Sequence, residues 1–383
     1  MNRNPLAVVL LSFLGLALTF IISSYSDVAA QKAPRNSSVP APPQTTTETV
    51  TRLRAKVPEA KASLKSSPNP DKPTEVAVGF YLTNLGRINQ SDETFDVSGY
   101  LSANWQDERL AFDPKVVGDT EKRENPEKVW EPALTIVNAQ SAPKKTAVSI
   151  TAKPDGNVNY LELVNTTVSS DLNLRNFPFD SQKAQVVLES LFFDDRSLVF
   201  HNDPKLTGYS KDSFVSLSEW QIIDVNTTVT PQKFAPNGKK YSRYTFELKL
   251  KRNYQFYLFK VFIPLLLITL LSWATFWMDS NAAFSTQMSV GMTSTLTAIT
   301  FNFTVANALP RLSYLTLLDA YIFICYIFFF LSIVANVTVH FFLKNYENPD
   351  FIDRMTRRFR WIFPLAFVIF QGIVMTVFLV GAN

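Results

Sequence analysis

Cysteine and histidine are almost absent from this chain of 383 residues, which has one cysteine and two histidines. The single cysteine, Cys325, lies inside an apolar run and cannot form a disulfide within the chain. So few of these side chains argue against a His/Cys metal site. We also find no phosphate loop, no nucleophile elbow and no pair of catalytic carboxylates. We therefore expect neither an enzyme nor a bound metal or cofactor.

An excess of charge is missing from most of the chain. The formal net charge is +4, and residues 31–75 supply all of it, with eight Lys or Arg against four Asp or Glu. Arg3 and Asp27 cancel within residues 1–30, so residues 76–383 balance to zero. Without a basic patch, the sequence does not indicate nucleic acid as a partner.

The first part of the chain does not have the pattern of a folded domain. Residues 1–30 have the features of a signal peptide, with Arg3, the apolar stretch Leu6–Ile22 and small residues before Gln31. That stretch is long for a signal, so an uncleaved membrane anchor is the alternative. Residues 31–75 are rich in Pro, Ser, Thr, Ala and Lys and lack apolar periodicity, which predicts a disordered arm.

Residues 76–252 show short runs of alternating apolar and polar residues separated by turn residues. This pattern is typical of half-buried strands. The fold class that it predicts is an immunoglobulin-like β-sandwich. The clearest runs are Thr94–Trp105, Asn157–Val168, Gln185–Leu191 and Tyr241–Leu250.

Residues 253–383 contain four apolar segments, each long enough to cross a bilayer. They predict a four-helix transmembrane bundle, so the whole chain is expected to be a β + α membrane protein. Aromatic residues crowd the segment ends, as at a membrane interface. The segments are about Tyr254–Trp277, Ala282–Ala308, Tyr314–Leu343 and Trp361–Ala382.

The orientation in the membrane follows from the stretch Lys344–Arg360, between the last two segments. It carries five basic residues against three acidic ones. By the positive-inside rule this loop is cytoplasmic. An even number of spans then places the β-domain and the C-terminus outside the cytoplasm, in agreement with a cleaved signal. We expect a multi-pass protein of the plasma membrane.

The second apolar segment carries a polar stripe at helical spacing. A helix that faces only lipid has no reason to keep such a stripe, whereas one that lines water does. Its two large apolar residues would gate a pore by dewetting. Alternatively, the hydroxyls bond to their own helix or to neighbouring helices. One helix cannot enclose a pore, so the pore hypothesis requires a symmetric ring of copies. The stripe consists of Ser289, Thr293, Leu296, Thr300, Phe303 and Asn307.

Several motifs in this order resemble those of one family. Trp105–Leu110 is similar to a W-x-D-x-R-L strand, and Trp130–Pro132 to the start of W-x-P-D, with Ala133 in place of Asp. Asn176–Gln182 is similar to an F-P-F-D-x-Q loop, and Leu309–Tyr314 continues the register in the membrane part. Over about residues 76–383, the chain resembles the pentameric ligand-gated ion channels, also called the Cys-loop receptor superfamily.

Two departures are similar to the prokaryotic branch of that family. Ser170 and Ala184 stand where animal receptors place the cysteines of the loop disulfide, and the loop after the third span is minimal. The resemblance implies a homopentamer in a lipid bilayer, opened by a small-molecule or proton agonist and passing small inorganic ions.

The resemblance also implies an agonist site between neighbouring β-domains, where aromatic side chains hold a small ligand. Tyr241 matches the loop that closes over the ligand, and Tyr100 matches the complementary face. Ordinary cross-strand packing is the alternative for both tyrosines. The positions carried over by register are Tyr100, Glu189, Ser190, Phe192, Phe193 and Tyr241.

Coupling between the two parts is expected at their seam. Arg252, just before the first span, would need an acidic partner there. The resemblance suggests Asp180, with Asp92 and Glu93 as weaker candidates. The segment after the polar stripe, with Pro310 and Arg311, is the part that the β-domain would push.

Ion selectivity is not fixed by the sequence. The inner end of the stripe, Phe284–Gln287, carries no charge, and Asp279 alone would favour cations weakly. We expect a slight preference for cations. A non-conducting receptor of the same architecture is the main alternative. A transporter or an envelope structural protein is a further alternative. The spans carry few charged residues, which argues against a proton- or ion-coupled transporter.

Overall fold

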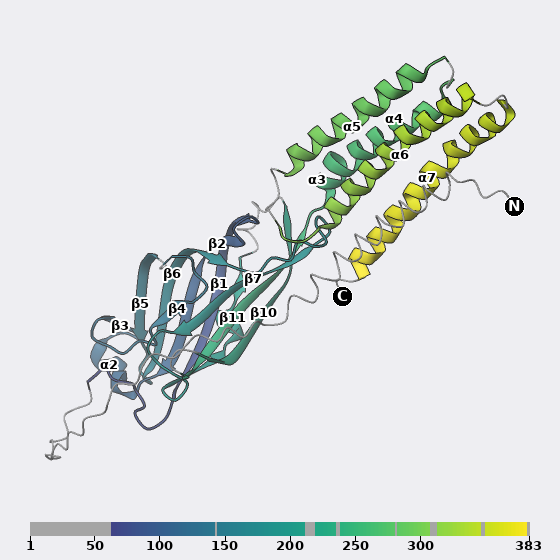
Figure 1. Cartoon of the computed structure of the whole chain (residues 1–383). Coiled ribbons are helices and arrows are strands. Elements are labelled where there is room, and N and C mark those ends of the chain that lie inside the picture. Colours follow the sequence, from purple (N-terminus) through teal and green to yellow (C-terminus); the bar gives the residue numbers. More distant parts are fainter. Residues whose placement is uncertain are drawn as a thin grey trace.

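The computed structural model describes residues 63–141, 144–210, 219–234, 238–279, 282–306, 312–345 and 349–380. A β-domain and a helical bundle lie end to end, and the last strand of the first leads into the first helix of the second (Figure 1). The expected signal, residues 1–30, and the first part of the expected arm, residues 31–62, lie outside the described residues.

The larger layer of the β-domain is a seven-stranded sheet in the order β3-β5-β6-β2-β1-β8, with β9 also paired to β1. Most neighbours are antiparallel, but β8 and β9 run parallel to β1. Its strands are β1 (Thr74–Asn89), β2 (Thr94–Gln106), β3 (Lys122–Glu124), β5 (Lys144–Ala152), β6 (Asn157–Ser169), β8 (Leu198–Asn202) and β9 (Gly208–Tyr209).

The smaller layer is a four-stranded antiparallel sheet in the order β10-β11-β7-β4. The two layers confirm the predicted β-sandwich. Short helices η1 (Glu108–Leu110), α2 (Pro114–Val117) and η2 (Pro204–Leu206) lie in its loops. The strands of this sheet are β4 (Leu134–Ile136), β7 (Ser181–Ser190), β10 (Trp220–Lys233) and β11 (Lys240–Arg252).

The sandwich core is formed by every second side chain of the facing strands. Along β11, alternate residues from Ser242 to Arg252 are buried. Phe246 of β11 and Phe80 of β1 are fully buried and meet edge to face across the two layers, with ring centroids 5.3 Å apart. Such alternation is what a strand needs when one of its faces packs on another sheet.

The helical part has four long helical segments in the described part of the chain. The first runs unbroken from Gln255 to Trp277 and is followed by three single helices, which pack side by side with it. The elements are α3 (Gln255–Tyr257), the π-helical turn η4 (Leu258–Phe262), α4 (Ile263–Ala274), η5 (Thr275–Trp277), α5 (Phe284–Ala306), α6 (Leu317–Asn345) and α7 (Pro349–Val380).

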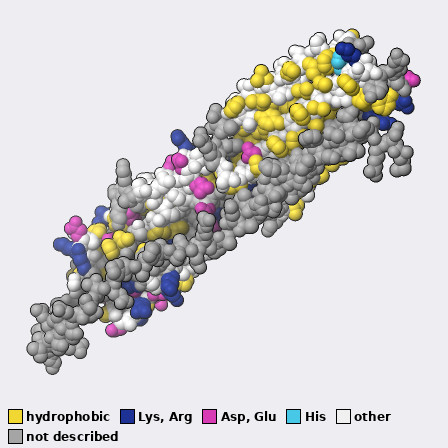
Figure 2. All heavy atoms as spheres, viewed as in Figure 1, with side chains coloured by type: hydrophobic (Ala, Val, Ile, Leu, Met, Phe, Trp, Pro, Cys, Tyr) yellow, Lys and Arg dark blue, Asp and Glu magenta, His cyan; other side chains and the backbone are white. Residues whose placement is uncertain are grey.

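Three of these segments, Gln255–Trp277, Leu317–Asn345 and Asp350–Val380, are long and apolar enough to cross a membrane. Helix α5, with 23 residues, has the length as well, but its many hydroxyls lower its hydropathy. Figure 2 shows hydrophobic side chains spread over the helical end, whereas charged side chains gather mainly on the β-domain. This distribution fits a bilayer around the helices and water around the β-domain.

The structure changes the expected start of the last helix. The stretch Lys344–Arg360 was predicted to be a loop, but α7 already begins at Pro349, so Arg354, Arg357 and Arg358 lie on a helix. The prediction used the loss of apolar character to mark the end of a span. A helix can continue beyond the hydrocarbon into water, where its exposed face becomes charged.

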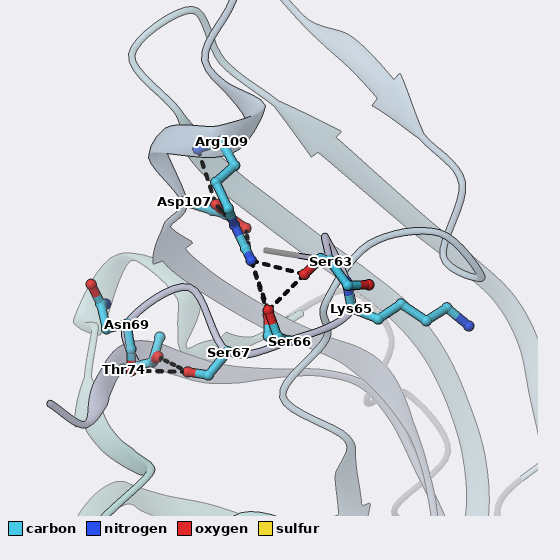
Figure 3. Close-up of polar contacts among 8 residues, drawn as sticks. All are labelled: Ser63, Lys65, Ser66, Ser67, Asn69, Thr74, Asp107 and Arg109. Atoms are coloured by element: carbon cyan, nitrogen blue, oxygen red, sulfur yellow. Dashed lines mark hydrogen bonds and ion pairs between the residues drawn. The ribbon is translucent and has the colours of Figure 1, made fainter. Parts of the chain in front are cut away.

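The first described residues are fixed to the β-domain by one arginine (Figure 3). Two N–H groups of Arg109 bind the carboxylate of Asp107 at 2.8 Å each. The others reach the Ser63 carbonyl at 3.1 Å, the Ser66 hydroxyl at 3.2 Å and the Ser66 carbonyl at 3.0 Å. Residues 63–66, which lie within the expected arm, are thus hydrogen-bonded to the sandwich.

Replacing Phe246 by alanine should destabilise the β-domain, because it leaves a cavity between the two sheets. The expected loss is about 3–5 kcal/mol, read as a lower thermal midpoint of the purified protein. Val116→Ala is the matched control, since Val116 is 83% exposed and its loss should leave the midpoint within error. Equal midpoints for the two variants would contradict the packing described.

Candidate functional site

A buried ion pair lies at the junction of the two parts. The Nε of Arg252 is 2.7 Å from Oδ1 of Asp180, and Nη2 is 3.0 Å from Oδ2. The two side chains are 0% and 2% exposed. The backbone N–H of Arg252 also donates to the Asp180 carbonyl, at 3.2 Å. The last residue of β11 is therefore tied to the loop before β7 through both side chain and main chain.

Aromatic rings enclose the guanidinium of Arg252. Its central carbon lies 4.1 Å from the ring centroid of Trp220, 4.7 Å from that of Phe177 and 6.0 Å from that of Tyr257. Taking a charge out of water is costly unless it is paired, and cation–π contacts offset part of that cost. The site thus holds one cation and one anion in a mainly aromatic setting.

The loop Ser170–Asp180 is the main contact of the β-domain with the helices. Leu174 and Phe177 belong to the hydrophobic core of the helical part. The Phe177 ring lies 4.6 Å from that of Tyr257 at the start of the first helix. The N–H of Leu174 donates to the Tyr314 hydroxyl at 3.2 Å, ahead of α6. Sequence analysis placed Tyr314 in the motif Leu309–Tyr314, but it predicted no contact at the junction for Tyr314 or Tyr257.

The weaker coupling candidates lie in the turn between β1 and β2. Asp92 accepts a hydrogen bond from the Asn89 side chain at 2.8 Å. Glu93 has a positive φ of 52°, and its carbonyl accepts from the N–H of Ser170 at 2.9 Å. This turn therefore contacts the same loop as Asp180. Among the described residues, no ion pair joins either carboxylate to Arg252. Pro310 and Arg311 lie outside the described residues.

On the smaller sheet, Glu189 is paired with Arg243, its cross-strand neighbour on β11. The Nε and Nη2 atoms of Arg243 each lie 2.6 Å from the same carboxylate oxygen. Sequence analysis missed Arg243, because only the strand register brings the two residues together. The carboxylate of Glu189 is already compensated, so the pair offers both signs of charge to a ligand.

The residues that follow Glu189 in the expected agonist site differ in exposure. Phe192 is 73% exposed. Ser190 is buried, and its hydroxyl donates to the Pro132 carbonyl at 2.7 Å. Phe193 packs against Trp130, with ring centroids 5.4 Å apart. Phe192 is therefore free to meet a ligand, whereas Ser190 and Phe193 hold the loop in place.

The hairpin between β10 and β11 carries Tyr241 and is tied to the loop after β7. The Lys239 ammonium lies 3.2 Å from the Asp194 carboxylate. The N–H of Asp195 donates to the Lys240 carbonyl at 2.8 Å. Burial acts to raise the pKa of Asp194. The hydrogen bond and charge of Lys239, together with hydrogen bonds from the Ser197 hydroxyl and the Arg196 N–H, hold that pKa below its usual value.

Tyr100 lies on the other sheet, on β2. Tyr100 and Tyr241 occupy outward positions of their strands, so a single copy of the chain holds them on opposite faces of the sandwich. It is part of the lining of a cavity of about 470 Å³. The lining combines apolar side chains with one cation and one anion, and includes Arg123, Glu124, Leu161 and Leu163.

Helix α5 has one packed face and one free face. Gln287, Gly291, Ser294 and Ala298 are on the packed side. Gly291 is required there, because a Cβ would lie 2.8 Å from the Ile333 side chain of α6. On the opposite side, the expected stripe is exposed over Ser289, Thr293, Leu296, Thr300 and Phe303.

The stripe does not behave uniformly. The Thr300 hydroxyl donates to the carbonyl of Leu296, four residues earlier, at 3.0 Å. At this position, therefore, the hydroxyl bonds to its own helix, as in the alternative to the pore hypothesis. Leu296 and Phe303 are 65% and 68% exposed and alternate with the hydroxyls. Asn307 lies outside the described residues. Figure 1 shows α5 along one side of the bundle and α7 along the opposite side.

Arg252→Met should reduce the amount of assembled protein strongly, because Asp180 would remain buried and unpaired. Breaking such a pair costs about 3–5 kcal/mol. The measurement is the yield and thermal midpoint of the purified assembly. Arg357→Met is the matched control: the Arg357–Asp353 pair is 70% and 57% exposed, and such pairs contribute about 0–1 kcal/mol. Wild-type yield and midpoint for Arg252→Met would contradict a role for the pair.

The ion pair between Lys239 and Asp194 should persist when the pH is lowered to 5. Because the pKa of Asp194 is lowered in the folded protein, the stabilisation is present above the usual aspartate value of about 4 and is lost only as pH falls through the lower, folded value. Hydrogen exchange of residues 191–200, corrected for intrinsic rates, should therefore show equal protection at pH 7.5 and pH 5. Asp194→Asn should lose protection at both. Loss of wild-type protection by pH 5 would contradict this.

Comparison with known proteins gives the same assignment along most of the chain. Residues 60–254 match the model of the neurotransmitter-gated ion-channel ligand binding domain. Residues 261–350 match the neurotransmitter-gated ion-channel transmembrane region. The gap between the two matches, residues 255–260, directly follows the junction that holds the buried ion pair.

Three relatives illustrate the range of similarity. A proton-gated ion channel of Gloeobacter violaceus is 34% identical over 302 residues, which cover 79% of this chain and 82% of that protein. The human gamma-aminobutyric acid receptor subunit rho-2 is 28% identical over 72% of this chain and 60% of its own length. The chicken subunit beta-4 is 25% identical over 70% of this chain and 55% of its own length. The chain thus spans little more than half of these receptor subunits.

From the two domain matches and the 34% identical relative, the chain belongs to the neurotransmitter-gated family of pentameric ligand-gated ion channels.

Proposed function

We propose that five copies of this chain form a homopentameric channel whose central pore is lined by the free face of α5. The observation that carries the proposal is the division of α5 into two faces. Gly291 and Ala298 pack against the rest of the bundle, while Thr293, Leu296 and Phe303 are exposed. A ring of such faces would provide hydroxyls toward water and two apolar rings able to gate by dewetting.

The agonist site of this proposal lies between neighbouring copies. One copy contributes Tyr241, Phe192 and the Glu189–Arg243 pair, and the next contributes the cavity beside Tyr100. Tyr100 and Tyr241 face outward from opposite sheets of the sandwich, so the proposed site joins groups from two copies. The exposed aromatic and charged groups suit a small polar ligand. A proton is the other candidate agonist, because one relative is a proton-gated channel.

The proposed location is the plasma membrane, with the β-domain and the C-terminus outside and the Lys344–Arg360 stretch in the cytoplasm. The basic residues at the start of α7 support this orientation. Residues 1–30 would act as the signal. Residues 31–75 were expected to form an arm, but β1 already begins at Thr74, so the proposed arm ends before that residue. The permeant species are small inorganic ions, with a weak preference for cations from Asp279. The proposal involves no catalytic step, no metal or cofactor and no nucleic acid.

A non-conducting receptor of the same architecture is the second candidate. The observation that favours it is the size and exposure of Leu296 and Phe303, which would place two bulky apolar rings in the pore. Hydrophobic constrictions of this kind exclude ions when they are narrow. In this case the chain would respond to its ligand only through contacts at the junction.

Current recording distinguishes the two functions. Cells expressing the chain should respond to pH steps, or to a panel of amines and amino acids, and the shift in reversal potential on NaCl dilution gives the sign of the permeant ion. Leu296→Ser should open at a lower agonist level, because a hydroxyl hydrates the constriction. Val116→Ala, on the exposed outer surface, should leave activation unchanged. Silence of both wild type and Leu296→Ser, with protein at the cell surface, would favour the non-conducting receptor.

A further inference from the structure

The inner end of the first membrane segment presents under-satisfied carbonyl groups. This segment stops at Trp277, so most carbonyls of its last turn lack the N–H groups that would follow in a longer helix. The carbonyl of Thr275 accepts one backbone N–H, from Met278 at 3.2 Å. Ser272, Thr275 and Phe276 are buried, so water is not available to replace those partners. Side chains from the neighbouring helices must supply the donors, and the structure shows which ones do.

Helix α6 supplies two of these contacts. The Ser332 hydroxyl donates to the Ser272 carbonyl at 3.3 Å. The Asn336 amide donates to the Thr275 hydroxyl at 2.9 Å, and this hydroxyl donates to the Ser272 carbonyl at 2.7 Å. All four residues are buried. Together they form a chain of hydrogen bonds between α6 and the end of the first segment.

Helices α7 and α5 supply the remaining contacts. The Nε of Arg360 donates to the Phe276 carbonyl at 2.9 Å. The side-chain amide of Gln287, on α5, donates to the Thr275 carbonyl at 3.0 Å and, at a longer 3.4 Å, to that of Met278. The carbonyls of residues 272–278 thus form a hub that receives donors from all three other helices.

Gln287 is the contribution of the pore helix to this hub. It is fully buried and lies on the packed face of α5, opposite the stripe. The next side-chain tether is eleven residues further, where the Tyr326 hydroxyl donates to the Ala298 carbonyl at 3.3 Å. Between them Ser294 is also buried, but its hydroxyl has no hydrogen-bond partner among the described residues. At the very start of α5, the ring of Phe284 also stacks on that of His340 of α6, with centroids 3.8 Å apart. The inner end of α5 is therefore held back from its free face by the hydrogen bonds of Gln287 and by this ring contact.

We propose that Gln287 is a positioning residue that sets the width of the inner mouth of the pore. The inference rests on the proposed function, in which the free face of α5 lines that pore. Gln287 lies next to Thr286 and close to Ser289, both exposed on the free face. Its hydrogen bonds to the Thr275 and Met278 carbonyls hold this end toward the first segment and away from the axis. Without them, the inner end can move inward, which narrows the mouth.

The test compares Gln287→Met with Ser294→Ala. Methionine keeps the length of the side chain but removes the donor. The inner end of α5 can then be held against the first segment or move inward, and the ratio of the first state to the second should fall about fivefold for each hydrogen bond of ordinary strength that is lost. Unitary conductance in symmetrical NaCl should fall, and the largest permeant ion should become smaller. The probes are alkylammonium chlorides for a cation pore and sodium carboxylates of increasing size for an anion pore. Ser294→Ala should match wild type, because its hydroxyl bonds to nothing described.

A distance measurement keeps this test separate from conduction. Spin labels at Ser285→Cys, in a Cys325→Ser background, should give shorter and broader distances between copies in Gln287→Met than with Gln287 intact. Gln287→Asn retains an amide donor but ends one carbon short, so it should change in the same direction and serves if the methionine variant does not assemble. Unchanged conductance and unchanged distances would overturn the proposal. If the wild type carries no current but Gln287→Met still shows the shorter distances, the pore assignment is overturned and the positioning role of Gln287 stands.

Discussion

The guanidinium of Arg252 is withdrawn completely from water at the point where β-domain, connecting loop and first helix meet. Such a charge is tolerated only because Asp180 neutralises it and aromatic rings surround it. The loop that supplies Asp180 also inserts Phe177 into the core of the helical part. Neutralising the arginine and docking the bundle are therefore the same structural event, and a shift in either part must disturb the other.

Much of the fold could be predicted, because half-buried strands and apolar helices leave strong periodic patterns. The run Thr94–Trp105 became β2 with a difference of one residue. The strand expected to begin at Gln185 begins earlier, at Ser181. The prediction started too late because the inward-facing residue at position 182 is a glutamine, which breaks the apolar alternation. That side chain is buried and donates to Asp180, so polarity masked a core position. Polar residues buried by tertiary hydrogen bonds are invisible to such patterns.

The candidate site was predicted less completely. The exposed face of α5 follows from spacing alone, and the resemblance to a family suggested the pairing of Arg252 with Asp180. The roles of both remain proposals. Arg243 could not be found, because it lies 54 residues from Glu189 and meets it only through the sheet register. Gln287 was equally hidden, since a stripe on one face says nothing about what anchors the other.

The contacts of Arg109 limit what can replace it. Its five N–H donors meet five acceptors, two on Asp107 and three on Ser63 and Ser66 (Figure 3). Lysine has only three donors around a single point and lacks the planar fork that matches a carboxylate. A change that conserves charge would therefore leave acceptors of the chain unsatisfied. At this position geometry, and not charge, decides which residue natural variation can accept.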